Sequence, residues 1–366
     1  MKIKTITCHD VYNYGASLQA YALMHYLEPL GHEVEIIDYK PEYLSQHYKL
    51  CVSNPRFDKP VLKQLYLFIK MLPYLYSLKK KKKFDAFKNS FLKLTSDRYH
   101  SNEDLKNNLP DADIYIAGSD QIWNTLFNNG KDPAFYLDFV PASKIKASYA
   151  ASMATDKLSK DIQPFVKSMV EKLDFVGVRE SSAAQILSDL GIDNIHVVCD
   201  PVFLLSKEQW MSLIDIHRPL HKKPYVFVYD FERSSLVRKV VDNLKKTNNL
   251  DVVSIGWNKL HGQLDDSVNF GPLEFLNLVY HAEYVVSNSF HATAFSIIFQ
   301  KEFYVIRRSE HINTRMEDLL GMFHLKGQLV SDVDSLNFES INYKEVDIML
   351  DSFVNQSKNY IEAIVK

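Results

Sequence analysis

The first forty residues alternate between strand and helix patterns, and this order restricts the possible folds more than any other feature. Ile3 to Thr7 is rich in β-branched residues and predicts a strand, and Ser17 to Leu30 carries apolar residues at helical spacing before Gly31 ends the helix. Glu33 to Asp38 predicts a second strand. A strand, a helix and a strand in this order predict a βαβ unit in a parallel sheet with a right-handed crossover.

The same alternation continues in two further series. Strand patterns lie at 113–117, 145–149, 175–178 and 196–199, and then, beyond a polar stretch with Pro219 and Pro224, at 225–229, 251–255, 284–286 and 303–306. We therefore expect an α/β fold with two Rossmann-like doubly wound domains, at 1–205 and 206–345. Residues 41–110 interrupt the first series and predict a helical insertion, and 346–366 predict a C-terminal helix that packs back on the first domain.

Composition and charge argue against several classes of protein. With 366 residues, 46% of them hydrophobic, the chain suits two domains with sizeable cores. A net charge of -2 gives no global reason to bind nucleic acid, and no apolar run reaches the 18 residues that span a bilayer. The three cysteines are scattered and the first residues have a strand pattern rather than that of a signal peptide, so we expect a cytoplasmic protein with reduced thiols.

The segment from Tyr284 to Phe299 joins a buried strand to the start of a helix. Ser287, Asn288 and Ser289 follow the strand and are residue types that cap helices, and His291 then falls in the first helical turn. A helix N-terminus has free N–H groups and a partial positive charge, so it suits phosphate or carboxylate, and a histidine there can donate a hydrogen bond or move a proton. The alternative is an ordinary strand-to-helix junction with a surface histidine.

Polar residues at the ends of other strands are further candidates, because ligands bind at the carboxyl ends of the strands in doubly wound sheets. Arg179 could reach across to an anion held at His291, since a guanidinium suits carboxylate or phosphate; a salt bridge to Glu180 is the alternative. Asp120 could act as a base or orient a hydroxyl, or it could cap a helix that begins near Gln121.

The first βα turn and one tryptophan complete this set. Asn13 can bind sugar hydroxyls and Gly15 permits close approach of the backbone, although Asn13-Tyr14-Gly15 is also a common type of turn. Trp123 could stack on a sugar ring or be a core residue. Asp200 and the proline after it are assigned to a turn, without chemistry.

Six short motifs at these strand ends, taken in order, resemble the polysaccharide pyruvyl transferases. The resemblance covers about residue 5 to residue 320, and some members of that family have an arginine two residues before the histidine of the last motif, where this chain has Ser289. The motifs are HDVYNYGASLQ at 9–19, GSDQIWN at 118–124, YAAS at 149–152, VRE at 178–180, CDPV at 199–202 and NSFHATAFS at 288–296.

The resemblance implies both a fold and a reaction. Such enzymes adopt a glycosyltransferase-B-like pair of Rossmann-type domains. They transfer the enolpyruvyl group of phosphoenolpyruvate to two hydroxyls of one sugar as a pyruvate ketal, and phosphate leaves. Their acceptors are lipid-linked or nucleotide-linked precursors of bacterial surface glycans, such as exopolysaccharide and capsule.

This chemistry gives roles to the candidate residues. We expect His291 to bind phosphate and act as the acid, Asp120 to act as the base, and Arg179 to hold an anionic group of the donor. No cluster with metal-ligand spacing occurs in the sequence, so we expect no metal and no cofactor apart from phosphoenolpyruvate as donor substrate. The other expected substrate-binding residues are Asn13, Tyr14, Gly15, Ser119, Trp123, Asn288, Ser289 and Phe290.

The sequence allows two interpretations of the insertion and two further hypotheses for the function. Val61 to Ser77 is apolar and leads into Lys79 to Lys83, which suits peripheral contact with an anionic membrane surface; the alternative is a helix packed on the core with a solvated basic face. The same architecture would suit a glycosyltransferase that uses a nucleotide-sugar. A non-catalytic glycan-binding or scaffold protein is the third hypothesis.

Overall fold

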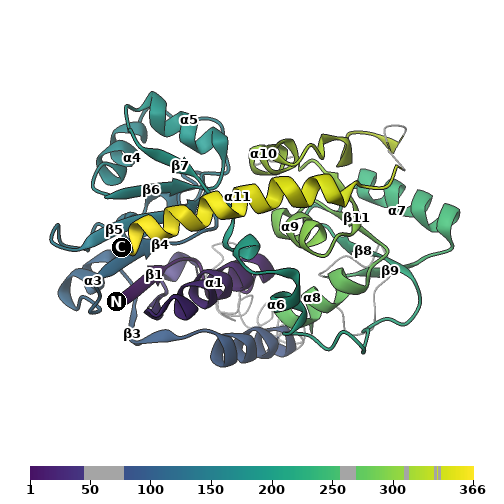
Figure 1. Ribbon diagram of the computed structural model, residues 1–366, viewed down its shortest axis with the longest axis horizontal. Coiled ribbons are helices and arrows are strands. Elements are labelled where there is room, and N and C mark those ends of the chain that lie inside the picture. The colour runs from purple at the N-terminus through teal and green to yellow at the C-terminus, as the bar shows by residue number, and fades with distance from the viewer. Residues whose placement is uncertain (45–77, 256–268, 309–312, 334–335, 337–338) are drawn as a thin grey trace, which may run out of the picture.

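The computed structural model describes residues 1–44, 78–255, 269–308, 313–333, 336 and 339–366. These residues form two α/β lobes that lie side by side, each built on its own parallel sheet (Figure 1). This confirms the α/β class with two doubly wound sheets. The strands form where short apolar runs lie between polar turns, since a parallel strand is covered on both faces.

The first sheet has seven parallel strands in the order β3-β2-β1-β4-β5-β6-β7. The first six positions follow the Rossmann order, and the order of the strands reverses between β1 and β4. The strands are β1 (Lys2–Ile6), β2 (Glu33–Tyr39), β3 (Leu94–Tyr99), β4 (Ile114–Ala117), β5 (Ile145–Ala151), β6 (Phe175–Val178) and β7 (Ile195–Val197).

The second sheet has five parallel strands in the order β12-β11-β10-β8-β9. This is the flavodoxin-like order, which reverses between β8 and β10. The strands are β8 (Tyr225–Tyr229), β9 (Asp251–Ser254), β10 (Tyr284–Ser287), β11 (Glu302–Ile306) and β12 (Leu329–Val330).

The helices cover both sheets and join the two lobes. Short 3-10 helices include η1 (Glu28–Leu30), η2 (Glu42–Leu44), η5 (Asn128–Lys131), η6 (Pro133–Tyr136), η7 (Pro201–Leu204) and η10 (Lys326–Gln328). The α-helices are α1 (Tyr14–Leu27), α3 (Asn102–Asn107), α4 (Gln163–Val170), α5 (Ser181–Asp189), α6 (Lys207–Met211), α7 (Ser235–Asn248), α8 (Pro272–His281), α9 (Phe290–Ile298), α10 (Thr314–Met322) and α11 (Tyr343–Ile364).

The prediction of a purely helical insertion at 41–110 is wrong in part. Residues 78–91 are helical, but β3 lies inside the same stretch and extends the first sheet beside β2. Three consecutive residues of β3, Ser96 to Arg98, are exposed, as an edge strand allows, so no apolar run marks it in the sequence. Val61 to Ser77, the apolar part of the proposed membrane contact, lies outside the described residues.

An apolar interface holds the two lobes together, and α1 lies at its centre. This helix packs on η7, α8 and α9, and nearly all of it is buried. Tyr14 stacks on Phe275 with ring centroids 5.1 Å apart and meets Tyr229 edge-on. Its hydroxyl donates a hydrogen bond to the carbonyl of Phe270 at 3.1 Å. The β1–α1 turn is therefore fixed against the second lobe.

The C-terminal helix α11 crosses from the second lobe to the first (Figure 1). Near its start, Tyr343 donates a hydrogen bond to the carbonyl of Lys301. Near its end, Tyr360 donates to the carbonyl of Ser148 on β5 at 2.9 Å, and Ser357 accepts from the backbone N–H of Cys199 at 2.8 Å. The helix is amphipathic and contributes one face to the largest apolar cluster.

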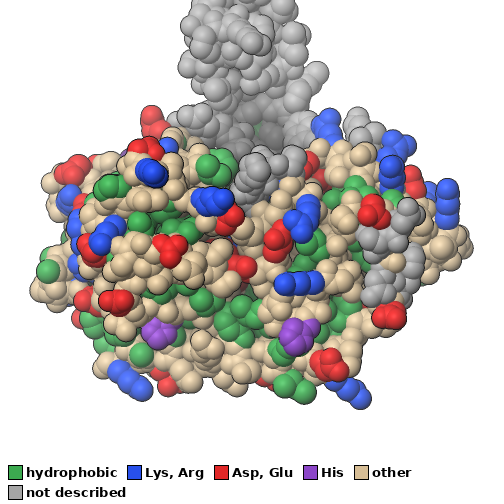
Figure 2. Space-filling view, turned by 90° about the horizontal axis from the view of Figure 1, so that it is seen from above, with side chains coloured by type: hydrophobic (Ala, Val, Ile, Leu, Met, Phe, Trp, Pro, Cys, Tyr) green, Lys and Arg blue, Asp and Glu red, His purple; other side chains and the backbone are tan. Residues whose placement is uncertain are grey.

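The lysine run at 79–83 makes several contacts within the protein. Lys83 pairs with Glu274 of α8 and Lys81 pairs with Asp85, each at 2.5 Å, while the ammonium of Lys80 lies 4.9 Å from the ring centroid of Tyr14. On the face shown in Figure 2, basic and acidic side chains of the described residues are interspersed. In the described part of the chain, no helix has the length and apolar character needed to cross a membrane.

Candidate active site

The turn between β10 and α9 places His291 at the start of a buried helix. Ser287 donates its hydroxyl to the carbonyl of Tyr229 at 2.6 Å and accepts the N–H of Ser289 at 3.0 Å. Ser289 is the N-cap of α9, and its hydroxyl accepts the N–H of Ala292. The imidazole of His291 is therefore held in the first turn of the helix, where the helix dipole is positive.

The β1–α1 turn of the first lobe meets this histidine directly. Gly15 lies so close to His291 that a Cβ atom added to Gly15 would lie 1.9 Å from Nδ1 of the imidazole. Asn13 precedes it as the N-cap of α1, and its side-chain oxygen accepts the N–H of Ala16 at 3.2 Å. The places where the strand order reverses in the two sheets therefore face each other at His291. Because Gly15 has no side chain, the imidazole ring can occupy the space beside it.

Arg179, at the end of β6, lies in the same cluster and is paired with two carboxylates. Its Nη1 donates to Asp200 Oδ2 at 2.7 Å and its Nε donates to Glu180 Oε1 at 3.0 Å. Ser152 also donates to Glu180 Oε1, at 2.5 Å. Burial alone would lower the pKa of Arg179, but Glu180, Asp200 and Asp120 outweigh it and raise the pKa. The guanidinium stays charged and fixed in direction.

Asp200 connects Arg179 to His291. Its Oδ2 accepts hydrogen bonds from Arg179 and from the Ser119 hydroxyl at 2.9 Å, and it lies 3.5 Å from Nε2 of His291. Burial alone would raise the pKa of Asp200, but His291 and Arg179 hold it well below its usual value. Oδ1 meanwhile accepts the N–H of Val202 at 3.1 Å, so the residue shapes the expected turn as well. The sequence prediction gave Asp200 no part in the site, and the structure corrects this.

A second buried guanidinium, from α10, completes the cluster. Arg315 is 5% exposed, and in the described part of the chain it has no ion pair with a carboxylate. Its guanidinium carbon lies 6.0 Å from the ring centroid of Phe290, and that of Arg179 lies 4.1 Å from the same centroid. Burial and then Arg179 lower the pKa of Arg315 to about 10. Two like charges around one ring repel each other, so an anion between them would stabilise both.

Four buried polar atoms of this cluster have no hydrogen-bond partner among the described residues. They are Nη2 of Arg179, Oε2 of Glu180, Nε2 of His291 and Nε of Arg315. Buried polar groups in folded proteins are nearly always paired. Nη2 of Arg179 and Nε of Arg315 make no hydrogen bond, and Nε2 of His291 has only its 3.5 Å ion-pair contact with Asp200. These three nitrogens around one ring mark a place where an anionic ligand can bind, and Oε2 of Glu180 also has no hydrogen bond.

Asp120 lines an open cavity in the first lobe and interacts electrostatically with both Arg179 and Arg315. Its φ of 75° lies in the left-handed region, which aspartate tolerates better than most residues. No helix begins at Gln121, so the capping interpretation is wrong: Asp120 makes an isolated parallel β-bridge with Ala151, and residues 121–127 form an irregular segment of turns and bends. The cavity has a volume of about 540 Å³ and is lined by Asp120, Asn13 and Gln121, among others.

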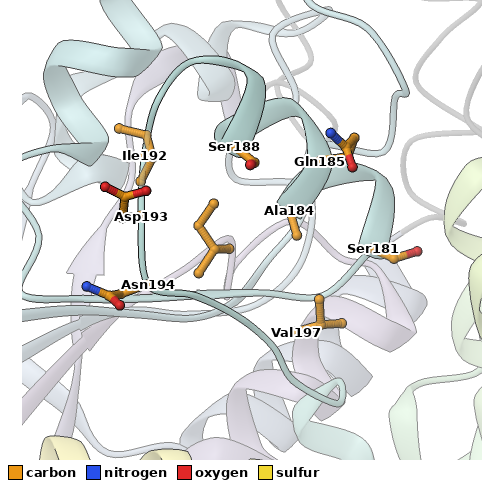
Figure 3. A pocket seen from close by; sticks show the side chains of 9 residues that line it. Ser181, Ala184, Gln185, Ser188, Ile192, Asp193, Asn194 and Val197 are labelled. Carbon is orange, nitrogen blue, oxygen red and sulfur yellow. The ribbon is translucent and has the colours of Figure 1, made fainter.

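Another cavity, of about 350 Å³, lies between α5 and β7 (Figure 3). Its lining residues include Gln185, Ser188, Asp193 and Asn194, with neither lysine, arginine nor histidine among them. None of the predicted site residues lines it. It therefore offers no cation to a phosphate or carboxylate.

Several predicted substrate-binding residues instead have structural roles in the core or in the interface between the lobes. Trp123 is fully buried, stacks on Tyr136 with ring centroids 5.2 Å apart and donates its N–H to the carbonyl of Phe135 at 3.0 Å, so it is the core residue of the alternative interpretation. Tyr14 is buried in the interface between the lobes, and buried Asn288 donates its amide to Asp230 at 2.7 Å.

The remaining predicted residues lie in or beside the cluster. Ser119 is buried and donates a hydrogen bond to Asp200, and Ser289 caps α9. The ring of Phe290 lies against the two guanidinium groups. The sequence analysis considered Glu180 as the ion-pair partner of Arg179, and the structure shows that pair. It did not include Arg315 in the site, since no local pattern marks that residue. Within the described ranges, no group of three or more His, Cys, Asp or Glu could hold a metal ion.

Comparison with protein-family models gives one match. The model described as polysaccharide pyruvyl transferase matches residues 13–310. The chain belongs to the polysaccharide pyruvyl transferase family. It is therefore a member of a family of transferase enzymes, and the resemblance found in the six motifs is confirmed. The family match contains every predicted site residue, while Arg315 lies just beyond its end. A comparison with curated protein sequences finds no match.

Comparison with solved structures supports the fold of this pyruvyl transferase family member. Three of the similar structures have a glycosyltransferase-B-like fold. At 12–15% identity, this similarity supports the fold of the chain and not its function. The Staphylococcus aureus MnaA–UDP co-structure has a TM-score of 0.55 at 14% identity, covering 100% of this chain and 98% of that one. The Methanocaldococcus jannaschii UDP-GlcNAc 2-epimerase has 0.51 at 15%, covering 100% and 99%, and a putative UDP-N-acetylglucosamine 2-epimerase from Listeria monocytogenes has 0.50 at 12%, covering 99% and 95%.

Proposed function

We propose that the protein transfers the pyruvyl group of phosphoenolpyruvate to two hydroxyls of one sugar. The observation that carries the proposal is the arrangement around Phe290. Arg179 comes from the first lobe, and His291 and Arg315 come from the second. Each keeps a buried nitrogen without a hydrogen bond in the described residues, and that of His291 has an ion-pair contact with Asp200 at 3.5 Å. Phosphoenolpyruvate carries a phosphate and a carboxylate on the same carbon, C2, and it needs several donors at short range.

Arg315 also accounts for a departure from the family pattern. Where some family members have an arginine two residues before the histidine, this chain has Ser289, whose hydroxyl is used as the N-cap of α9. The guanidinium of Arg315 lies beside Phe290, the residue between Ser289 and His291. In our proposal, Arg315 supplies from α10 the cationic contact that Ser289 cannot.

The proposed reaction divides into proton transfers and bond changes that balance. An acid gives a proton to the methylene carbon C3, and C2 becomes electrophilic. One sugar oxygen bonds to C2 and a base takes its proton; the C2–O bond to phosphate then breaks, and phosphate leaves with the electron pair. A second hydroxyl of the same sugar adds to C2 and loses its proton. One of the two hydroxyl protons replaces the one spent on C3, and the other leaves with phosphate.

The described residues suit these roles. His291, at the positive end of α9, serves as the acid that faces C3 and as a phosphate contact. Asp120 serves as the base, because it lines the open cavity and interacts electrostatically with both guanidiniums. Asp200 does not touch the substrate in this scheme; it holds Arg179 in place and lies beside the imidazole.

Phosphate release in the presence of sugar acceptors tests the proposal. The protein is incubated with phosphoenolpyruvate and a panel of lipid-linked and nucleotide-linked sugars, and free phosphate and the ketal methyl signal are followed together by NMR. We expect both to appear in equal amounts, and neither with His291→Asn. If only a nucleotide-sugar stabilises the protein, it is a glycosyltransferase. If phosphoenolpyruvate stabilises it and no acceptor in the panel turns over, the site has a binding role.

A further inference from the structure

The open cavity beside Asp120 has dimensions and a lining of its own. Its volume of about 540 Å³ lies within the ~300–1,000 Å³ typical of small-molecule sites. It is built entirely from the first lobe: the β1–α1 turn, η2 and the turn that follows Asp120. Neither Phe290 nor the two arginines beside it line the cavity, whereas Asp120 lines it and interacts electrostatically with both arginines.

The chemistry of the lining selects against a charged ligand. Asn13, Gln121, Asn128 and Asn129 contribute amides and Asp120 contributes one carboxylate, with no lysine, arginine or histidine among the lining residues. A phosphate or a uronic acid would meet a carboxylate here without any cation. Neutral hydroxyls, in contrast, can both donate to and accept from amides and a carboxylate.

The turn after Asp120 is held in place by its own hydrogen bonds. The buried amide of Asn124 donates to Gln121 Oε1 at 2.7 Å and accepts the N–H of Leu126 at 3.0 Å. Asn129 donates to the backbone carbonyl of Gln121. The side-chain oxygen of Gln121 is thus already used, which fixes its amide nitrogen as a donor for a ligand in the cavity.

One wall of the cavity is apolar and exposed. Leu126 is 62% exposed and Phe127 is 51% exposed, and both line the cavity. Large apolar side chains on the surface of a small-molecule site, beside several amides, suit a sugar ring, which has C–H faces as well as hydroxyls. The wall and the amides together fit a pyranose better than a purely polar or purely apolar molecule.

We propose that this cavity is the acceptor subsite and that it takes a neutral sugar residue, with any charged carrier group outside it. The inference rests on the proposed function, because the Asp120 carboxylate then faces the hydroxyls that attack C2. It adds a statement about substrate class: the residue that receives the pyruvyl group is a neutral hexose or N-acetylhexosamine rather than a uronic acid or a sugar phosphate.

Binding of simple glycosides tests the inference without the natural acceptor. The probes are the p-nitrophenyl β-D-glycosides of galactose, glucose, mannose and N-acetylglucosamine, with the glucuronide as the anionic comparison, measured by saturation-transfer NMR at up to about 10 mM. We expect at least one neutral glycoside to bind and the glucuronide not to bind. Gln121→Leu should weaken binding about three- to tenfold, as the loss of one hydrogen bond predicts.

Two further variants separate the cavity from general effects. Gln185→Leu makes the same change in the cavity between α5 and β7 and should bind the neutral glycoside as the wild type does. Phe127→Ala removes an exposed ring without breaking a hydrogen bond and should also weaken binding. The inference is overturned if the glucuronide binds as tightly as the neutral glycosides, if no glycoside binds, or if Gln121→Leu and Phe127→Ala bind as well as the wild type.

Measuring the thermal stabilisation by phosphoenolpyruvate distinguishes a failure of the sugar subsite from a failure of the proposed function. Gln121→Leu should show the same stabilisation as the wild type, because Gln121 does not belong to the cluster around Phe290. If the wild type shows no such stabilisation but binds a neutral glycoside in this cavity, the donor assignment fails and the sugar subsite stands. If the stabilisation is normal and no glycoside binds, the subsite fails and the donor assignment stands.

Discussion

Gly15 and His291 come from different lobes, and a methyl group on Gly15 would lie 1.9 Å from Nδ1 of the imidazole. The glycine is needed here for space and not for an unusual backbone angle. The backbone of the β1–α1 turn is therefore in direct contact with the imidazole. The two lobes have to meet at this point for the candidate site to exist.

Gly15→Ala should displace His291 and impair phosphoenolpyruvate turnover about 100-fold, since a shift of about 1 Å in a catalytic group has effects of that size. Overpacking should also lower the free energy of unfolding by about 1–3 kcal/mol. Steady-state kinetics and urea unfolding measure the two effects. Gly321→Ala is the matched control, because the added methyl meets only the flexible end of Lys326. It should leave turnover unchanged and raise the free energy of unfolding by no more than about 1 kcal/mol.

Arg315→Met should separate stability from binding. Removing a buried cation without a carboxylate partner should leave the melting temperature of the ligand-free protein unchanged or a few degrees higher, because the repulsion with Arg179 disappears. The same variant should lose the thermal shift that phosphoenolpyruvate gives the wild type. Arg307→Met, on an exposed arginine paired with Glu317, should keep that shift. A normal shift in Arg315→Met would remove Arg315 from the site.

Asp120→Asn should abolish the base while preserving the fold. Asparagine also tolerates the left-handed conformation, so a φ of 75° causes little added strain. Turnover should fall about 10²–10⁴-fold, the usual contribution of a general base, while stabilisation by phosphoenolpyruvate remains. Rapid-quench measurement of ketal formation is the test, and wild-type turnover in this variant would mean that another group takes the hydroxyl proton.

Asp38 should make the first lobe sensitive to acid. Burial alone would raise its pKa, but hydrogen bonds from His9 and Arg98 lower the pKa to about 2. A carboxylate with a folded pKa below its unfolded value of about 4 stabilises the protein above about pH 4, and this contribution is lost as the pH falls toward about 2.

After allowance for screening by solvent, Asp38 should account for about 1–2 kcal/mol of the loss of stability over this window. Urea unfolding at the two pH values should show a smaller drop for Asp38→Asn than for the wild type. Asp156→Asn, at an exposed position, should show the wild-type drop. Equal drops in all three proteins would contradict the role given to Asp38.

Much of the fold can be read from the sequence because buried parallel strands are short apolar runs. Phe175–Val178 and Tyr225–Tyr229 are strands with the predicted limits, and the C-terminal helix predicted at 346–366 spans Tyr343–Ile364. The edge strand β3 could not be predicted in this way, since its exposed side chains remove the apolar pattern. The alternation of strands and helices predicts the class of fold. It does not predict the order of the strands in each sheet or their register.

The site is harder to predict because its members depend on tertiary neighbours. His291 is marked by a strand, a cap and a helix start within ten residues. Asp200 carries a turn pattern, and only the fold brings it to Arg179 and His291. Arg315 has no local pattern at all; its burial beside Phe290 is set by how α10 packs on α9. Trp123 shows the opposite error, a residue type common in sugar sites that the fold uses as core.

A crystal structure with phosphoenolpyruvate bound tests the central claim most directly. The account predicts the phosphate or the carboxylate within about 3 Å of nitrogens of both Arg315 and His291, with Arg179 beside the same molecule. It also predicts that C2 faces the cavity that Asp120 borders. Phosphoenolpyruvate bound elsewhere, with these three side chains as they are now and no ligand among them, would contradict the account.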